Sequence, residues 1–199
     1  LSQDLARMYK TKNASLRLLM KLDLRKAYDT IEWQFFHDLF KAFNFPSHFI
    51  NLIMEYITTT SYTITINGTG KGFFKGKCEL RQGDPISPLV FTMVMEYFSR
   101  MLMCTSRNKA FKFHPLCKAL NLNHLIFADD LLLFCRGDLK STAVMIETFN
   151  IFSRYSGLSI NEEKSSIYFH GVSMITAHRI LDYIRFNWGS YYLINIFIK

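Results

Sequence analysis

The stretch Leu-Ile-Phe-Ala-Asp-Asp-Leu-Leu-Leu-Phe at residues 125–134 places two adjacent acids between two short apolar runs. The runs are typical of paired strands, and Ala128-Asp129-Asp130 is typical of the tight turn between them. A turn alone accounts for two aspartates, because aspartate is favoured in turns. On a buried hairpin, however, two adjacent carboxylates repel each other unless a cation compensates them. This stretch by itself leaves both interpretations open.

A third carboxylate, Asp23, stands near the end of another apolar run, Leu-Arg-Leu-Leu-Met-Lys-Leu-Asp-Leu at residues 16–24. We expect this run to be a buried strand; if it neighbours the hairpin, Asp23 and Asp129 converge at one edge of a sheet. Three aspartates without Cys or His make a hard oxygen site that suits Mg²⁺ better than zinc. Carboxylates that hold two divalent ions about 4 Å apart serve nucleotidyl transfer. The pattern therefore indicates a candidate metal-dependent phosphoryl-transfer site.

The remaining segments alternate between helical and extended patterns, which favours an α/β or α+β fold. Asp29 and Glu32 are spaced as a capping box that opens a helix through Phe43, and a second helix is expected to run to about Ile57. Further elements are expected as a hairpin with strands at 62–66 and 73–79, helices at 87–107 and 139–155, and a strand at 165–169. Beyond residue 172 the pattern indicates no clear element.

Composition limits the class of protein. Hydrophobic residues make up 49% of the chain and charged residues 20%, which excludes a disordered tail or a solvated coiled coil. The formal net charge of +8 favours an acidic partner, nucleic acid before an anionic membrane. No apolar run is long enough for a membrane span, so we expect no membrane partner. The four cysteines are expected to be reduced core residues of an intracellular protein, with His114 and Cys117 at most half a zinc site.

Four sequence blocks stand in a fixed order within residues 17–171. They are Lys-Leu-Asp-Leu-Arg-Lys-Ala-Tyr-Asp at 21–29, Leu-Arg-Gln-Gly-Asp-Pro-Ile-Ser-Pro-Leu at 80–89, Phe-Ala-Asp-Asp at 127–130, and Ser-Gly-Leu-Ser-Ile-Asn at 156–161 followed by Lys-Ser. In order and spacing they resemble the reverse transcriptase family, in the form found in non-LTR (LINE-type) retrotransposons, particularly those of plants. One such block would be a weak signal, whereas four in order are specific.

The resemblance implies an α+β fold, namely a polymerase palm-like antiparallel sheet backed by helices, with truncated fingers and no thumb. Residues 1–171 would form the reverse transcriptase palm with partial fingers. Residues 172–199 would form a divergent C-terminal tail, because their sequence does not align to the family's primer-gripping hairpin and thumb.

The resemblance also implies a catalytic group. Asp23, Asp129 and Asp130 would hold two Mg²⁺ ions, with Mn²⁺ as a substitute, for nucleotidyl transfer from a dNTP to a primer 3′ hydroxyl. Lys164 would act as a general acid that assists the departure of pyrophosphate. An ordinary exposed lysine after a turn would give the same pattern. The implied partners are an RNA template, a DNA primer and dNTPs.

A second implied group binds the substrate. Tyr28 would pack under the sugar of the incoming nucleotide and disfavour a 2′ hydroxyl, although an ordinary core tyrosine would look the same. Gln82 and Gly83 match the loop that lies against the nucleotide and template, and glycine allows such a close backbone approach. A plain junction between loop and helix would explain the glycine but not Gln82. Arg81 is a candidate phosphate contact.

The implied function is that of an RNA-directed DNA polymerase, a nucleotidyltransferase. Because the parts that position primer and nucleotide are largely missing from these residues, we expect this chain to be weak or inactive by itself. The alternative is a noncatalytic transposon remnant or RNA-binding module. An RRM would have no use for Asp129 and Asp130, and a nucleotide cyclase would need a glycine-rich turn beside the acids. Nuclear localisation is expected from the resemblance alone, and the sequence does not fix the oligomeric state.

Overall fold

The structure is a computed structural model of the 199-residue chain and describes residues 15–59, 61–76, 80, 83–184 and 186–189. The chain divides into two compact units, which are described separately below. Unit 1 comprises Leu1–Arg25, Phe98–Ile151 and Ile160–Lys199, and unit 2 comprises Lys26–Tyr97 and Phe152–Ser159. In the described part of the chain, no helix has the length and apolar character needed to cross a membrane.

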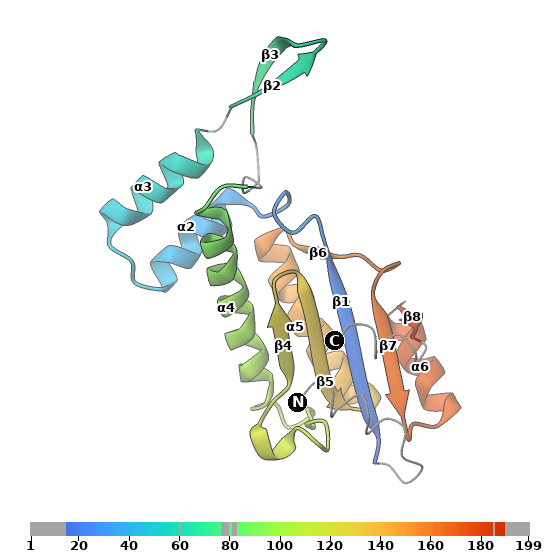
Figure 1. Cartoon of the computed structure of the whole chain (residues 1–199). Helices are drawn as coiled ribbons and strands as arrows, with labels where there is room; N and C mark the ends of the chain where they lie inside the picture. The colour runs from blue at the N-terminus through green and yellow to red at the C-terminus, as the bar shows by residue number, and fades with distance from the viewer. Residues whose placement is uncertain (1–14, 60, 77–79, 81–82, 185, 190–199) are drawn as a thin grey trace. The chain divides into compact units, whose positions relative to one another are not determined.

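Unit 1 is built on a six-stranded sheet in the order β4-β5-β1-β7-β8, with β6 also paired to β1 (Figure 1). Strand β1 pairs antiparallel with β5 and β7, and β4 pairs antiparallel with β5. Strand β8 runs parallel to β7, so the expected antiparallel sheet is present with one short parallel strand added at its edge. The strands are β1 (Arg17–Arg25), β4 (His124–Phe127), β5 (Asp130–Arg136), β6 (Ser159–Ile160), β7 (Ser166–His170) and β8 (Asn187–Trp188).

Strand β1 is central in the sheet and is buried on both faces along most of its length. Leu18, Met20 and Leu22 are fully buried on one face. On the other face Leu19 belongs to a buried cluster with Cys117, Phe134 and Tyr168. Burying one such side chain stabilises the fold by about 1.5–3 kcal/mol. The continuous apolar run in the sequence therefore predicted this strand correctly.

Helices α5, α4 and η1 belong wholly or partly to unit 1, and helix α6 is described below. Helix α5 (Leu139–Ser156) lies behind β4, β5 and β1 in Figure 1. Asp138 caps its start, because the Ser141 N–H donates to the Asp138 carboxylate at 2.9 Å. Helix α4 (Ser87–Thr105) and the short 3₁₀ helix η1 (Lys118–Leu120) precede β4. The expected start of α4 at Ser87 and the expected extent of α5 are confirmed.

The sequence indicated no element beyond residue 172, whereas the structure contains two. Helix α6 (Met174–Ile184) begins after Ser173, whose hydroxyl accepts the Thr176 N–H at 3.3 Å. Strand β8 follows and places the Trp188 ring 5.4 Å from that of Phe169, between centroids. The assignment of residues 172–199 to a divergent tail stays a prediction.

Unit 2 holds helices α2 (Trp33–Ala42) and α3 (Ser47–Thr58), the hairpin of β2 (Ser61–Ile66) and β3 (Thr69–Lys75), and the first part of α4. Asn67 and Gly68, with φ of 49° and 79°, form a two-residue hairpin turn in which both residues have positive φ. The turn is therefore tighter than the expected turn at 67–70, and β3 begins at Thr69 rather than Phe73. The end of the expected strand, at 77–79, lies outside the described residues.

The predicted capping box at the start of α2 is wrong. Asp29 lies in a turn, and Glu32 occupies the N-cap position without a side-chain hydrogen bond. The Glu32 N–H instead donates to the Ser156 carbonyl at 3.0 Å, a partner distant in sequence. Gly157, which follows Ser156, has φ of +80°, and a Cβ there would collide with the Thr30 carbonyl. A tertiary contact therefore fixes the start of α2, and glycine is required for the close approach.

The cysteines match the expectation of buried, reduced residues only in part. Cys117 and Cys135 are buried, and burial raises their thiol pKa to about 11 and about 12 respectively, so both stay protonated and unreactive. Cys104 is exposed on α4, contrary to the expectation. Cys78 lies outside the described residues.

Candidate functional site

Asp23 and Asp130 lie directly opposite each other on β1 and β5 of unit 1. Directly opposed residues of antiparallel strands point to the same face, with Cβ atoms about 4.5–5.5 Å apart. Both residues are half-buried. The two carboxylates therefore share one face of the sheet at the last pair of this ladder. The strands are neighbours, which is the condition that the sequence left open, but the residue opposite Asp23 is Asp130 and not Asp129.

Asp129 occupies the exposed turn between β4 and β5, next to this pair. The register pairs Phe127 with Asp130, so only Ala128 and Asp129 form the turn, and Asp130 is the first residue of β5. Ala128 has φ of 52°, a left-handed conformation that is uncommon for a residue with a Cβ. Among the described residues, no three His, Cys, Asp or Glu side chains are arranged so that they could hold a metal ion. The structure thus brings Asp23 and Asp130 together and leaves Asp129 in the adjoining turn.

Lys21 completes the local charge balance. It lies two residues before Asp23 on β1 and therefore on the same face of the strand. Its Nζ atom is 3.1 Å from a carboxylate oxygen of Asp130, and its side chain is only 15% exposed. The lysine ammonium partly compensates the two neighbouring carboxylates. No role for Lys21 was predicted from the sequence; the signal that could have indicated one is its two-residue spacing from Asp23.

The segment that contains Lys164 is tied to the backbone of Asp23. The Asp23 N–H donates to the Ser165 hydroxyl at 3.1 Å, and the Asp23 carbonyl accepts the Asn161 N–H at 2.8 Å. The Ser165 N–H donates to the Asn161 carbonyl at 3.0 Å, which closes the turn between β6 and β7. Lys164 is exposed in this turn. Ser165 and Asn161, which are distant from Asp23 in sequence, are thereby held beside it, one by its N–H and the other by its carbonyl.

Tyr28 lies in unit 2 and is half-buried. Its ring stacks on Phe91 of α4 with centroids 4.9 Å apart and an interplanar angle of 28°. Its carbonyl accepts the Leu80 N–H at 2.7 Å. Tyr28 is therefore fixed by packing and by its backbone, while part of its surface remains accessible.

The loop before α4, also in unit 2, contains Gly83 and Asp84. Gly83 has φ of +87°, so a residue with a Cβ would be strained there although the surrounding space is open. The Asp84 carboxylate accepts the Tyr56 hydroxyl at 2.7 Å, which ties the loop to α3. Arg81 and Gln82 lie outside the described residues.

His114 and Cys117 form a buried pair in unit 1. The Cys117 Sγ atom is 3.6 Å from His114 Nδ1, and His114 has no exposed surface. Burial, together with the positive charge of Arg17, lowers the pKa of His114 to about 4. The imidazole is therefore neutral near pH 7 and packs against Phe134 in the core, with ring centroids 6.2 Å apart. His114 and Cys117 are therefore two packed residues of the core.

Solved telomerase structures share this fold. Telomerase from Candida tropicalis in complex with a fragment of telomeric RNA superposes with a TM-score of 0.57 at 15% identity, over 86% of this chain and 29% of that chain. Telomerase from Candida albicans gives 0.59 at 12% identity, over 88% of this chain and 31% of that chain. At this identity the likeness concerns the fold alone, which is the palm-like fold of reverse-transcriptase-type polymerases.

The sequence then identifies the family. Residues 2–185 match the family described as Reverse transcriptase (RNA-dependent DNA polymerase), and the chain belongs to it. A Pol polyprotein of the retrotransposable element R2 from Popillia japonica is 30% identical over 146 residues, which cover 73% of this chain and 23% of the relative. One from Drosophila melanogaster is 26% identical over 161 residues, which cover 81% and 14%. This chain thus spans less than a quarter of either relative, and these insect relatives support a non-LTR element without supporting a plant origin.

Proposed function

We propose that this chain is the catalytic palm of an RNA-directed DNA polymerase and that it transfers a nucleotide from a dNTP to a primer 3′ hydroxyl on an RNA template. The observation that carries the proposal is the cross-strand pair of Asp23 and Asp130, two carboxylates on one face of the central strands. A site that only packs or only binds RNA gains nothing from two facing carboxylates, which repel each other. A site for divalent cations requires them.

The donor chemistry of these residues fits Mg²⁺ or Mn²⁺. The candidate ligands are all carboxylates. Those of Asp23 and Asp130 lie on one face of the sheet, and that of Asp129 lies in the adjoining exposed turn. We assign Asp23, Asp129 and Asp130 as ligands of two such ions. When bound, the ions would activate the 3′ hydroxyl and neutralise charge that develops on the triphosphate. The side chain of Asp129 must turn toward the pair for all three carboxylates to act together.

Lys164 is assigned to the departing pyrophosphate. The hydrogen bonds of Ser165 and Asn161 to the Asp23 backbone keep its turn beside the strand that carries the carboxylate. Its exposed ammonium group would donate a proton to the leaving oxygen. Lys164 would thereby lower the charge that accumulates on pyrophosphate as the bond to it breaks.

The remaining residues are assigned to positioning. The fixed ring of Tyr28 would pack under the sugar and exclude a 2′ hydroxyl, while Arg81, Gln82 and Gly83 would contact the nucleotide and template. The left-handed backbone of Gly83 supports a close approach of the loop to a ligand. Membership in the plant LINE-type group and nuclear localisation stay predictions from the sequence resemblance.

Primer extension tests the proposal against a noncatalytic RNA-binding module. The chain is incubated with an RNA template, a DNA primer, dNTPs and Mg²⁺ or Mn²⁺. We expect slow extension that stops when the metal is chelated, because positioning supplies much of the acceleration in phosphoryl transfer and this chain spans a small part of its relatives. RNA binding without any extension in either metal would favour the noncatalytic module.

Replacing Lys21 tests the charge balance of the site. Because Lys21 and a divalent cation compete for Asp130, we expect Lys21→Gln to bind Mn²⁺ several-fold more tightly than the wild type. In the absence of metal, the variant should lose at most about 1 kcal/mol of unfolding free energy, since the ion pair is partly exposed. Calorimetric titration and urea unfolding measure the two quantities. Lys41→Gln, at an exposed position on α2, is the control, and unchanged or weaker Mn²⁺ binding by Lys21→Gln would contradict the competition.

A further inference from the structure

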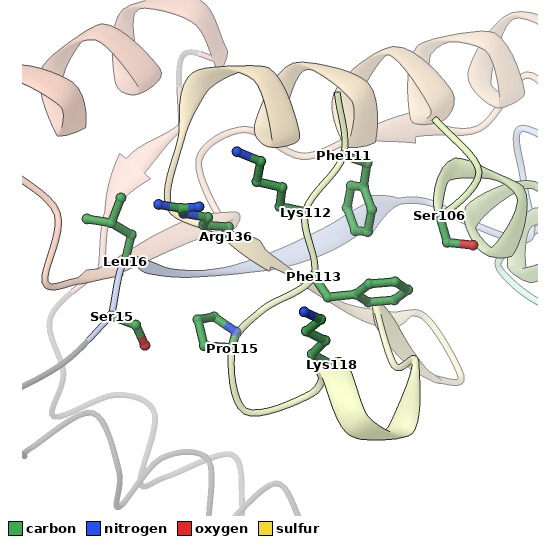
Figure 2. Close-up of a pocket in the computed structure, with 9 residues that line it drawn as sticks. All are labelled: Ser15, Leu16, Ser106, Phe111, Lys112, Phe113, Pro115, Lys118 and Arg136. Atoms are coloured by element: carbon green, nitrogen blue, oxygen red, sulfur yellow. The ribbon is translucent and has the colours of Figure 1, made fainter. Parts of the chain in front are cut away.

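A cavity of about 760 Å³ opens within unit 1, at the opposite end of the β1–β5 ladder from the aspartates. Figure 2 shows Lys112 and Arg136 on one side of this cavity, Lys118 on the other, and Phe113 along its wall. Arg136 and Asp130 are six residues apart on β5, so they lie on the same sheet face and about 20 Å apart. The cavity is therefore separate from the candidate metal site.

The backbone holds the cavity's cationic wall in place. The Arg136 N–H donates to the Lys112 carbonyl at 2.9 Å, and the Lys112 N–H donates to the Ser141 hydroxyl at 3.0 Å. The segment around Lys112 thus lies alongside the end of β5 and is tied to the first turn of α5. Lys118 begins η1 and is exposed. The three cationic side chains come from three different segments and meet at one cavity.

The charge of this region is one-sided. The residues that line the cavity include Lys112, Lys118 and Arg136 and, among those described, no Asp or Glu. Asp138 lies 3.8 Å from the Arg136 Nε atom, but its carboxylate also caps α5 through the Ser141 N–H. The cavity therefore carries a positive potential that attracts a polyanion.

An aromatic ring stands beside these cations. Phe113 is half-buried, and its ring makes a T-shaped contact with that of Phe111, with centroids 5.2 Å apart and an interplanar angle of 78°. Phe111 itself is buried, so this contact holds the ring of Phe113 against the core. Stacking of a base on an aromatic side chain, next to a cationic groove for the backbone, is how proteins bind single-stranded nucleic acid without sequence preference.

We propose that this cavity binds a single-stranded nucleic acid segment, with phosphates on Lys112, Lys118 and Arg136 and one base stacked on Phe113. The site is a second anchor for the polyanion, remote from the aspartates. It acts without a metal ion and does not depend on the proposed polymerase activity.

The charge contribution is tested with a labelled 12-nucleotide oligouridylate and fluorescence anisotropy at several salt concentrations. We expect the double variant Lys112→Gln/Lys118→Gln to bind about tenfold more weakly at 150 mM salt. The slope of log K against log salt should fall by about 1.4, because about 0.7 is lost for each phosphate contact to a single strand. The control Lys109→Gln/Lys140→Gln removes the same charge from exposed residues outside the cavity lining and should change the affinity less than threefold. Equal effects of the two double variants would overturn the proposal.

The stacking contribution is tested at Phe113. Phe113→Leu keeps an apolar contact to Phe111 but removes the stacking surface, so we expect roughly tenfold weaker binding with an unchanged salt slope. Phe113→Tyr should restore the affinity. Wild-type binding by Phe113→Leu, or equal competition by inorganic polyphosphate, would reveal a simple anion site and overturn the single-strand assignment. Thermal unfolding by circular dichroism verifies that each variant is folded.

A last experiment distinguishes nucleic acid binding at this cavity from binding at the candidate metal site. Photocrosslinking with 5-iodouridine is expected to map to residues 111–118 and to persist in Asp23→Asn/Asp130→Asn. Loss of the crosslink in that variant, or crosslinks only outside the cavity, would place the nucleic acid elsewhere. Failure of primer extension would leave these outcomes unchanged, so the two proposals are tested independently.

Discussion

Asp23→Asn is expected to lower metal-dependent primer extension at least about a thousandfold, which corresponds to roughly 4 kcal/mol of activation free energy. Asparagine keeps the shape of the side chain but removes the negative charge that a hard divalent cation requires. The backbone hydrogen bonds of residue 23 to Ser165 and Asn161 do not involve the carboxylate and should persist. We therefore expect loss of activity without loss of folding, measured as single-turnover extension beside a thermal unfolding curve.

A matched control is available on α6. Asp182 is exposed on this helix, and Asp182→Asn should extend primers at the wild-type rate. Asp130→Asn should resemble Asp23→Asn, because the two carboxylates face each other across the same pair of strands. Extension by Asp23→Asn within tenfold of the wild type would contradict the assignment of this carboxylate to catalysis.

Acid is expected to destabilise the protein through His114. The pKa of this buried imidazole is about 4 in the folded protein and 6.5 in its unperturbed form. Between these two values the unfolded chain binds a proton that the folded chain does not bind, so stability falls as the pH falls from about 7 to 4. The loss attributable to His114 is about 2 kcal/mol at pH 5 and approaches roughly 3 kcal/mol at pH 4.

Urea unfolding at pH 7 and pH 5 measures this effect as a difference of unfolding free energies. His114→Asn removes the titrating group and should make that difference about 2 kcal/mol smaller, whatever its effect on stability at pH 7. His48→Gln, at an exposed position on α3, should leave the difference close to that of the wild type. If His114→Asn and the wild type lose the same free energy between the two pH values, the imidazole is not buried in neutral form.

The strands and long helices were predictable because their signals are local. The apolar run of β1 and the Ser87-Pro88 start of α4 each specify an element without reference to distant residues. Helix α6 was missed because its buried stripe is narrow, consisting of Ala177, Ile180 and Ile184. The apolar residues Met174 and Ile175 are exposed at its start and obscure the helical period.

Details set by tertiary contacts could not be read from the sequence. The start of α2 is fixed by the Ser156 carbonyl rather than by a local capping box, and no local pattern reports that partner. The same holds at the candidate site. Apolar patterning predicted the two buried strands, but only the structure shows that they are neighbours, that Asp130 stands opposite Asp23 and that Lys21 pairs with Asp130.

Binding of Mn²⁺, followed by electron paramagnetic resonance of the free ion, tests the central claim most directly. The wild-type chain is predicted to take up Mn²⁺ saturably, and Asp182→Asn is predicted to behave alike. Asp23→Asn/Asp130→Asn is predicted to lose this binding while its unfolding curve remains cooperative. Undiminished Mn²⁺ binding by that double variant would contradict the claim that the facing carboxylates of β1 and β5 form the metal site.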